Sequence, residues 1–242
     1  MTLNVSTFTK HQTTALAIMK TINRYKVVEK FISINGEGSR VGQLAAFIRF
    51  HYCNLNCSYC DSKYANGDNA KYDLLTSTDI LNYLNENKVI NVTLTGGEPL
   101  LQDNINDLIN ILIDHGYSVE IETNGSVDIA PFINGMNRPI FTLDYKLPGS
   151  NMENKMNLNN YQYLTKVDVV KFVIGDLEDL NRTKQIIDKY DLSNNVKVYF
   201  SPVFDKIEPS VIVDHMIKHH LNNITLQLQL HKFIWDVNKR GV

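Results

Sequence analysis

All three cysteines of this 242-residue chain lie in one stretch of eight residues, from Cys53 to Cys60, with the spacing C-x3-C-x2-C. Three thiolates on one short loop can converge on one metal cluster, and three is one fewer than a fully protein-ligated 4Fe–4S cluster requires. A cluster held in this way keeps one iron open for another ligand. The spacing therefore predicts a reactive 4Fe–4S cluster bound by Cys53, Cys57 and Cys60.

A structural zinc site is one alternative, because His51 lies two residues before Cys53 and could supply a fourth ligand. Such sites usually show two separated ligand pairs, which this loop lacks. A disulfide beside an odd cysteine is less favoured, because cysteines so close in sequence would close only trivial loops. Clustered reduced cysteines and the absence of a secretory signal indicate the cytoplasm.

The charge balance argues against a broad nucleic-acid-binding face. The chain has 24 basic and 26 acidic residues, which are interspersed and give a net charge of −2. Binding to a nucleic-acid backbone would require a basic stripe. No apolar run approaches the length that a membrane span needs. A small anionic substrate stays open, because it needs only one or two well-placed cations.

Strand and helix patterns alternate along the chain. Strand patterns cover 27–34, 44–50, 89–95, 119–122, 140–146, 167–174, 196–201 and 224–230. One helix pattern, with Ile80, Leu81 and Leu84 on it, begins after a cap at Ser77 or Thr78. Further helix patterns cover 105–112, 177–189 and 209–221. This alternation indicates βαβ units and a parallel sheet. About six units are too few for a closed eightfold barrel, so we expect an α/β fold of the partial, open (β/α)6 type with its chemistry at the carboxyl ends of the strands.

Residues 1–23 differ from the rest, because they lack glycine and the chain has no acidic residue before Glu29. We expect a peripheral, poorly ordered extension over 1–23 and one domain over 24–242. A targeting peptide, or a natural start at Met19, is the alternative.

The turn Thr95-Gly96-Gly97-Glu98-Pro99 follows a strand pattern. Glycines at a strand end let the backbone approach a ligand, and a carboxylate beside them can accept hydrogen bonds from an ammonium group. With the open iron, this turn could hold an amino acid by its amino and carboxylate groups. The two motifs together resemble the radical S-adenosylmethionine superfamily, in which a 4Fe–4S cluster and S-adenosylmethionine generate a 5′-deoxyadenosyl radical.

Further segments resemble the 7-carboxy-7-deazaguanine synthase family. They include Asn35-Gly36-Glu37-Gly38, Cys60-Asp61-Ser62 and Glu122-Thr123-Asn124-Gly125, and the resemblance runs from Val27 to the C-terminus. It implies a radical S-adenosylmethionine barrel with truncated helices over 24–242 that converts 6-carboxy-5,6,7,8-tetrahydropterin to 7-carboxy-7-deazaguanine with loss of ammonia, for queuosine-type deazapurines. It also implies a homodimer, Mg²⁺, and a flavodoxin- or ferredoxin-type electron donor.

The resemblance assigns roles to individual residues. The radical-generating cluster is bound by Cys53, Cys57 and Cys60, and magnesium is bound by Ser62. Substrate contacts come from Ile34, Asn35, Gly36, Glu37, Arg49 and Thr95, with Arg49 paired to the substrate carboxylate. S-adenosylmethionine contacts come from Tyr59, Cys60, Asp61, Gly97, Glu98, Asp144, Tyr145 and Lys146.

Some of these residues depart from the family pattern or have simpler explanations. The family often has threonine at Ser62, glutamine at Asn35, glycine at Tyr52, tryptophan at Tyr59, and Ser-Pro-Lys where this chain has Asp144-Tyr145-Lys146. Asp144 is the least conservative of these changes. As simpler readings, Arg49 would be a rim residue, Ser62 a turn hydroxyl and Lys146 a surface charge. His231 receives no role in the chemistry and is interpreted as a structural histidine, and Trp235 as a packing residue.

Two other functions share part of the pattern. A glycyl-radical-enzyme activase would share the cysteine loop and the Gly-Gly-Glu turn but would not need Glu37 and Arg49 arranged for a small anionic heterocycle. A non-catalytic iron–sulfur module would not need a cofactor cradle at the strand ends.

Overall fold

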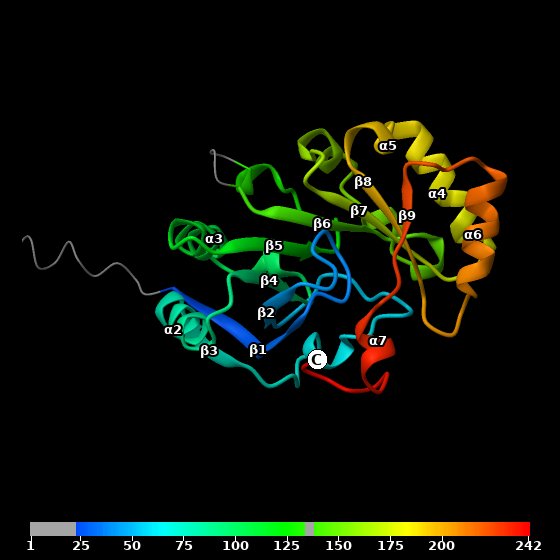
Figure 1. The fold of residues 1–242 in the computed structure, drawn as a ribbon. Coiled ribbons are helices and arrows are strands. Elements are labelled where there is room, and N and C mark those ends of the chain that lie inside the picture. Colours follow the sequence, from blue (N-terminus) through cyan, green and yellow to red (C-terminus); the bar gives the residue numbers. More distant parts are fainter. Residues whose placement is uncertain (1–22, 134–137) are drawn as a thin grey trace, which may run out of the picture.

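The computed structural model describes residues 23–133 and 138–242, and a nine-stranded sheet organises this part of the chain (Figure 1). The strands are β1 (Arg24–Ile34), β2 (Leu44–Phe50), β3 (Asp73–Thr76), β4 (Asn91–Gly96), β5 (Ser118–Thr123), β6 (Ile140–Tyr145), β7 (Val169–Ile174), β8 (Lys197–Pro202) and β9 (Ile224–Leu226). Their order across the sheet is β3-β1-β2-β4-β5-β6-β7-β8-β9. β2 and β4 to β9 run parallel, whereas β1 is antiparallel to β2 and β3. The expected open α/β fold is confirmed, because the sheet ends at β3 and β9 without closing within the described residues.

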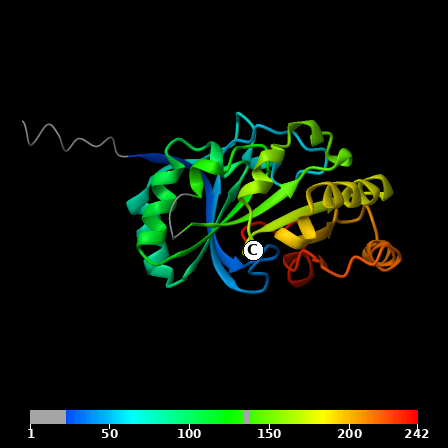
Figure 2. The same cartoon turned by 90° about the horizontal axis from the view of Figure 1, so that it is seen from above.

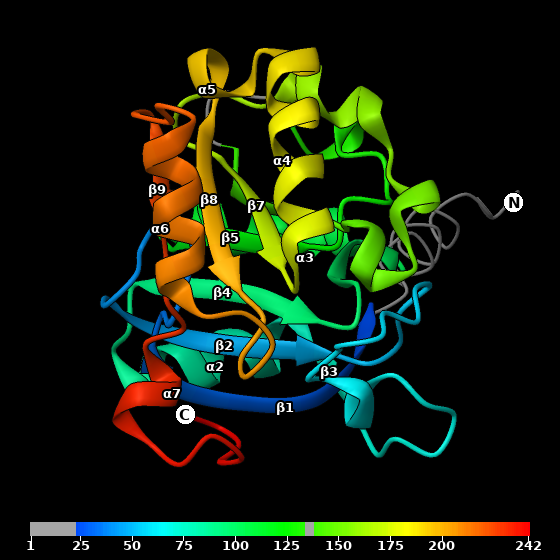
Figure 3. The same cartoon turned by 90° about the vertical axis from the view of Figure 1, so that its right-hand side faces the viewer.

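Helices cover the outer face of the curved sheet. They are α2 (Ser77–Asn87), α3 (Ile105–Asp114), α4 (Leu177–Tyr190), α5 (Leu192–Asn195) and α6 (Pro209–Lys218). The short helix α7 (His231–Ile234) lies instead beside the loop after β1, where His231 meets Gly36. Figure 3 shows α4 and α6 in front of β7 and β8, and Figure 2 shows α2 and α3 grouped at the other end of the sheet. Between β6 and β7 the chain has only short 3-10 turns, and the described residues between β5 and β6 contain one such turn, Ala130–Phe132. The helical layer is therefore truncated, as expected.

Alternating side chains give the sheet two different faces. The outer face carries buried apolar side chains of the main core, among them Ile48, Leu94, Ile121, Leu143, Phe172 and Phe200. The residues next to them in sequence point to the inner face, because successive side chains of a strand alternate. Those inner residues are largely polar and include Arg49, Thr95, Glu120, Glu122, Thr142, Asp144 and Lys171. Polar chemistry is therefore concentrated on the inner side of the curved sheet.

Several boundaries differ from those that the sequence predicts. α2 is capped by Thr76 rather than by Ser77 or Thr78, because Thr76 and Asp79 form a reciprocal capping box. The last strand ends at Leu226 rather than at residue 230. The short edge strand β3 was not predicted, since none of its four side chains is fully buried and its pattern is weak.

The extension expected over residues 1–23 lies outside the described residues except for Asn23, so that expectation stays a prediction. Asn23 itself donates its side-chain amide to Asp107 at 2.8 Å. Within the described part of the chain, every helix is too short or too polar for a bilayer crossing.

Candidate active site

The cysteine loop follows β2 directly, at the carboxyl end of a parallel strand. Cys57 is buried, and Cys53 and Cys60 are partly exposed. A main-chain N–H and the side-chain amide of Asn124 each lie 3.5 Å from Cys53 Sγ, and Asn66 Nδ2 lies 3.7 Å from Cys60 Sγ. Burial raises the pKa of the Cys53 and Cys57 thiols, and a bound metal would displace their protons. These N–H donors suit thiolate ligands, so the loop fits an iron–sulfur cluster.

The zinc alternative finds no support in the geometry. Within residues 23–133 and 138–242, no three His, Cys, Asp or Glu side chains are arranged to hold one metal ion. His51 Nε2 lies 3.2 Å from the carbonyl oxygen of Gly67, and its ring packs against Tyr72. An iron–sulfur cluster requires a different ligand geometry from a single zinc ion, because each thiolate binds a different iron and the sulfur atoms need not surround one ion. The donor set therefore fits a cluster, and His51 stays apart from it.

Close backbone approach explains both glycines at the end of β4. A Cβ atom on Gly97 would lie 2.0 Å from the carbonyl oxygen of Tyr52, and Gly96 has φ +136° beside the Phe50 backbone. The main-chain N–H groups of Gly97 and Glu98 donate to the carbonyls of Phe50 (3.2 Å) and Tyr52 (2.9 Å). Only residues without a side chain permit this contact. The glycines therefore dock the end of β4 onto the start of the cysteine loop.

Glu98 is fully buried behind this turn. Its carboxylate accepts hydrogen bonds from the main-chain N–H groups of Leu100 (3.1 Å) and Asn124 (2.7 Å) and from the Thr123 hydroxyl (2.9 Å). Burial raises the pKa of Glu98 to about 7. Because Asn124 also donates to Cys53 Sγ, Glu98 connects the turn to the cysteine loop through β5.

A largely buried network of alternating charges joins the two halves of the site, with Lys171 buried and its partners partly buried. Lys171 Nζ lies 3.2 Å from Asp144 Oδ1 and 3.4 Å from Glu37 Oε2, and Lys146 Nζ lies 2.7 Å from Asp144 Oδ2. The positive charge of Lys146 also lowers the pKa of Cys57, against the stronger effect of burial. The network therefore extends from Glu37 to the neighbourhood of the cysteine loop. Lys146 is not the surface charge of the simpler reading, because its side chain is only 11% exposed.

The two tyrosines assigned to the cofactor take different positions. Tyr145 is buried in the core on the outer face, and its hydroxyl donates to Glu153 at 2.6 Å, so only its backbone can reach the inner side. Tyr59 is partly buried, and its hydroxyl lies 3.4 Å from the carbonyl oxygen of Val173 on β7. Burial raises the pKa of Tyr59, since the phenolate would be poorly solvated there.

The loop after β1 presents buried polar atoms that have no partner. Asn35 Oδ1 accepts from the Thr93 hydroxyl at 2.8 Å, but Asn35 Nδ2 and Glu37 Oε1 are buried without a hydrogen-bond partner in the described structure. Buried polar atoms are normally paired, so a ligand with complementary groups is the simplest explanation. The Gly36 backbone runs against the His231 ring, and a Cβ atom there would lie 2.4 Å from Nδ1.

Arg49 and Thr95 are neighbours across β2 and β4 on the inner face. Arg49 Nε donates to Glu29 Oε1 at 2.6 Å, and Tyr64 donates to the same oxygen at 2.7 Å. Burial would lower the pKa of Arg49, but Tyr64 and Glu29 outweigh it and raise that pKa. These contacts fix the guanidinium group inside the site rather than at a solvated rim.

Thr95 donates its hydroxyl to Glu122 Oε2 at 2.7 Å. Burial raises the pKa of Glu122 to about 7, against the opposing charge of Lys171. A carboxyl group with such a pKa on the inner face could exchange a proton near neutral pH.

Asp61 and Ser62 supply two oxygen atoms beside the cysteine loop. The Ser62 hydroxyl donates to Asp61 Oδ1 at 3.0 Å, and Ser62 Oγ lies 4.0 Å from Cys60 Sγ. A hydroxyl and a carboxylate are hard ligands of the kind that magnesium prefers.

Several inner-face residues were not assigned roles from the sequence. They are Glu120, Glu122, Lys171, Gln227 and Gln229. A signal was available for some of them, because a charged residue inside an apolar parallel strand, as in Val169–Ile174, rarely lacks a buried partner. For the two glutamines no local pattern exists, since their partners lie 189 and 192 residues away.

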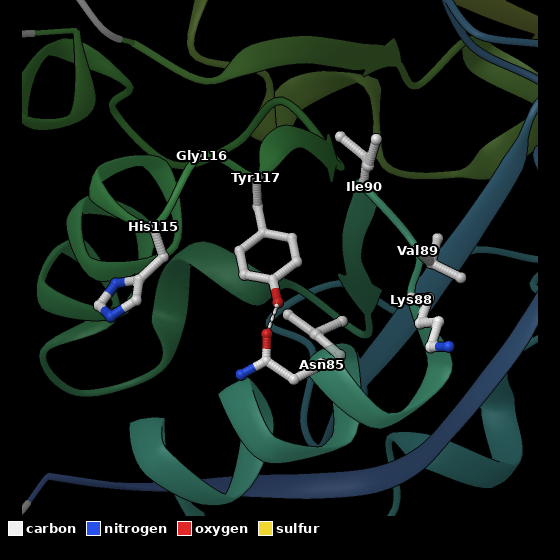
Figure 4. A pocket seen from close by; sticks show the side chains of 8 residues that line it. Asn85, Lys88, Val89, Ile90, His115, Gly116 and Tyr117 are labelled. Atoms are coloured by element: carbon white, nitrogen blue, oxygen red, sulfur yellow. Dashed lines mark hydrogen bonds between the residues drawn. The ribbon is translucent and has the colours of Figure 1, made fainter.

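A separate pocket of about 260 Å³ lies at the amino ends of the strands, opposite the cysteine loop (Figure 4). Ile90 and Tyr117, which line it, precede the amino ends of β4 and β5, and the Tyr117 hydroxyl donates to Asn85 at 2.6 Å. The pocket is thus remote from the carboxyl ends that carry the cysteine loop, and we assign it no function.

The chain resembles known proteins in sequence. Residues 47–144 match the family model described as the Radical SAM superfamily. The chain is 57% identical over 219 residues to a protein of Clostridium acetobutylicum named 7-carboxy-7-deazaguanine synthase, and the match covers 90% of this chain and 99% of that protein. A protein of Leptospira interrogans with the same name is 35% identical over 239 residues, covering 89% of this chain and 97% of that protein.

Solved structures resemble the fold. The crystal structure of QueE from Escherichia coli matches with a TM-score of 0.69 and 21% identity, covering 85% of this chain and 94% of that chain. Streptococcus suis SuiB bound to S-adenosylmethionine matches with a TM-score of 0.52 and 14% identity, covering 73% of this chain and 45% of that chain. At these identities the matches bear on the fold alone, and they agree with an open barrel.

Proposed function

The chain belongs to the 7-carboxy-7-deazaguanine synthase family of radical S-adenosylmethionine enzymes, and on this premise we propose that it converts 6-carboxy-5,6,7,8-tetrahydropterin to 7-carboxy-7-deazaguanine with loss of ammonia. This carbon–nitrogen lyase reaction serves the formation of queuosine-type deazapurines. The shared name of the relatives matches this reaction rather than a protein activase or a binding module. The observation that carries the proposal is the largely buried charge network from Glu37 through Lys171 and Asp144 to Lys146 beside the cysteine loop.

Cys53, Cys57 and Cys60 would bind three irons of a 4Fe–4S cluster and leave the fourth iron open to S-adenosylmethionine. When bound, the cluster and S-adenosylmethionine supply the radical that removes hydrogen from the substrate. The residues that would line this cofactor are Tyr59, Cys60, Asp61, Gly97, Glu98, Asp144, Tyr145 and Lys146.

Three of these residues would act without a side-chain contact to the cofactor. The Glu98 carboxylate is already bonded within the protein, so it would hold the turn and Asn124 in place for the cofactor. Tyr145 would contribute only main-chain groups, because its side chain is packed on the outer face. Asp144 would hold Lys146 and Lys171 in position.

The pterin would bind between the loop after β1 and the inner face of the sheet. Arg49 would direct its terminal nitrogen atoms to the substrate carboxylate, because Nε is already paired with Glu29. Asn35 Nδ2 and Glu37 Oε1, both buried without partners in the described structure, would bind the polar edge of the heterocycle. Ile34, Gly36 and Thr95 complete the proposed contacts.

Ser62 is the proposed magnesium ligand, since its hydroxyl and the Asp61 carboxylate form an oxygen pair beside the cysteine loop. Magnesium usually keeps several waters, so one protein hydroxyl and substrate oxygens are sufficient partners.

The proposal also covers the assembly and its setting. We infer one catalytic domain over 24–242, a homodimer, a flavodoxin- or ferredoxin-type electron donor, and a cytoplasmic location that suits three reduced thiols.

Anaerobic reconstitution with iron and sulfide tests the reaction. The reconstituted protein is incubated with S-adenosylmethionine, a reductant and the carboxytetrahydropterin, and the products are read by mass spectrometry. We expect 7-carboxy-7-deazaguanine and 5′-deoxyadenosine, without any protein substrate. 5′-Deoxyadenosine with an unchanged pterin would reject this substrate, and the absence of both would reject the enzyme class.

A further inference from the structure

Gln227 joins the C-terminal segment to the loop after β1 by two reciprocal hydrogen bonds. The Gly38 main-chain N–H donates to Gln227 Oε1 at 2.8 Å, and Gln227 Nε2 donates to the Gly38 carbonyl oxygen at 3.0 Å. Gln227 is only 5% exposed. One side-chain amide thus satisfies both main-chain groups of Gly38, as a neighbouring strand would.

Gln227 is itself anchored to the sheet. Its main-chain N–H donates to the carbonyl oxygen of Phe200 at 2.8 Å, which continues the β8–β9 ladder past the end of β9. The Leu230 main-chain N–H then donates to the Gly36 carbonyl oxygen at 3.1 Å, and Gln229 Nε2 donates to Glu37 Oε2 at 3.1 Å. The segment 227–230 therefore lies along the loop that carries Asn35 and Glu37.

Glu120, on β5, binds the same loop after β1 from the inner face of the sheet. Its carboxylate accepts from the Ser39 main-chain N–H at 3.1 Å and from the Thr142 hydroxyl at 2.6 Å. Gly38 has φ +81°, and a Cβ atom there would lie 2.5 Å from Glu120 Oε1. The loop therefore fits between Glu120 and Gln227, and only glycine is accommodated at residue 38.

We propose that Gln227 is a positioning residue for the substrate, which holds residues 35–38 in place so that Asn35 and Glu37 meet the pterin edge. The inference rests on the proposed function. The β1–β2 loop and the last strand belong to opposite halves of an open sheet, so their relative position depends on such cross-contacts. Small misplacements of binding groups are costly to recognition and catalysis.

The test compares Gln227→Met, which keeps the approximate size but removes both hydrogen bonds, with a matched control, Asn160→Leu. Asn160 is a buried amide that bonds main-chain groups of another loop, at residues 125, 127 and 129. Two readouts are taken on the reconstituted protein: hydrogen–deuterium exchange of peptides over 35–43, and the dissociation constant of 7-carboxy-7-deazaguanine by calorimetry.

For Gln227→Met we expect faster exchange over 35–43 and product binding weakened by about tenfold or more, since two buried main-chain groups lose their partner. Asn160→Leu should lower the melting temperature but leave both readouts as in the wild type. If Gln227→Met fails to fold, Gln227→Asn, which is too short for both bonds, should show the same two changes.

The outcomes distinguish the positioning role of Gln227 from the proposed function of the protein. Wild-type exchange and affinity in the Gln227 variant would overturn the positioning role while leaving the proposed function intact. Equal loss of affinity in Gln227→Met and Asn160→Leu would show that Gln227 contributes only to the overall stability of the fold. That result would also overturn the positioning role. Failure of the wild-type protein to bind the product would overturn both.

Discussion

Asp144 and Lys171 form a largely buried ion pair across β6 and β7, with Oδ1 and Nζ 3.2 Å apart. The other oxygen of Asp144 pairs with Lys146, so two ammonium groups share one carboxylate, and Glu37 supplies a second carboxylate to Lys171. Burial alone would raise the pKa of Asp144, but the two lysines outweigh it and hold the pKa below its usual value. Asp144, the residue that departs most from the family pattern, is therefore the centre of the site's charge network.

Asp144→Asn should destabilise the protein by about 3 kcal/mol, because Lys146 loses its carboxylate partner and Lys171 keeps only Glu37. Urea unfolding at neutral pH measures the change. Lys184→Ala serves as the control, since it breaks an exposed ion pair with Asp188 and should cost no more than about 0.5 kcal/mol. Equal effects of the two substitutions would show that the buried pair carries no special stability.

Glu122 predicts a specific pH dependence of stability. Its folded pKa is raised to about 7 from the ordinary 4.5, so the folded state binds this proton more tightly than the unfolded state does. The contribution therefore favours folding below pH 4.5 and is lost as the pH rises towards 7. Glu122→Gln should flatten the fall in unfolding free energy across this window. Parallel pH profiles for the two proteins would argue against a raised pKa at Glu122.

Arg49→Ala should weaken product binding by about 2–5 kcal/mol if the guanidinium pairs with a buried carboxylate. Calorimetry with 7-carboxy-7-deazaguanine measures the change in the free energy of product binding. Arg24→Ala, at an exposed arginine of β1, is the control for loss of charge and should bind as the wild type does. An unaltered dissociation constant for Arg49→Ala would remove Arg49 from the substrate site.

Ser62→Ala should reduce the magnesium dependence of turnover, because a hard oxygen ligand is lost. Titration of activity with magnesium measures the shift, and Ser62→Thr should restore it by keeping the hydroxyl. Ser58→Ala, in the same loop, is the control. Superimposable titrations for Ser62→Ala and the wild type would exclude Ser62 as a ligand.

Local patterns in the sequence predict much of this fold. The limits of β2, Leu44–Phe50, agree with the prediction to the residue, because a short apolar run with an arginine near its end is a clear strand signal. The cysteine loop and the glycine turn also fall at strand ends, as predicted. The alternation of Asp144 with Tyr145 could have placed the tyrosine on the outer face in advance.

Contacts between distant segments could not be predicted in this way. The bonds between Gln227 and Gly38 join residues 189 positions apart, and they depend on how far the sheet curves. The partners of Lys171 come from two other elements, the loop after β1 and β6. A single sequence contains no periodic signal for such pairings, so the polar network emerged only from the structure.

The central claim is that three thiolates leave one iron open for a sulfonium cofactor whose radical removes hydrogen from the pterin. The most direct measurement is the mass of 5′-deoxyadenosine after anaerobic turnover with a pterin deuterated at the position of abstraction. We predict that deuterium appears in 5′-deoxyadenosine, and that Cys57→Ala abolishes both this product and the visible absorbance of the cluster. Formation of 7-carboxy-7-deazaguanine with no deuterium in 5′-deoxyadenosine, or with no 5′-deoxyadenosine at all, would contradict the claim.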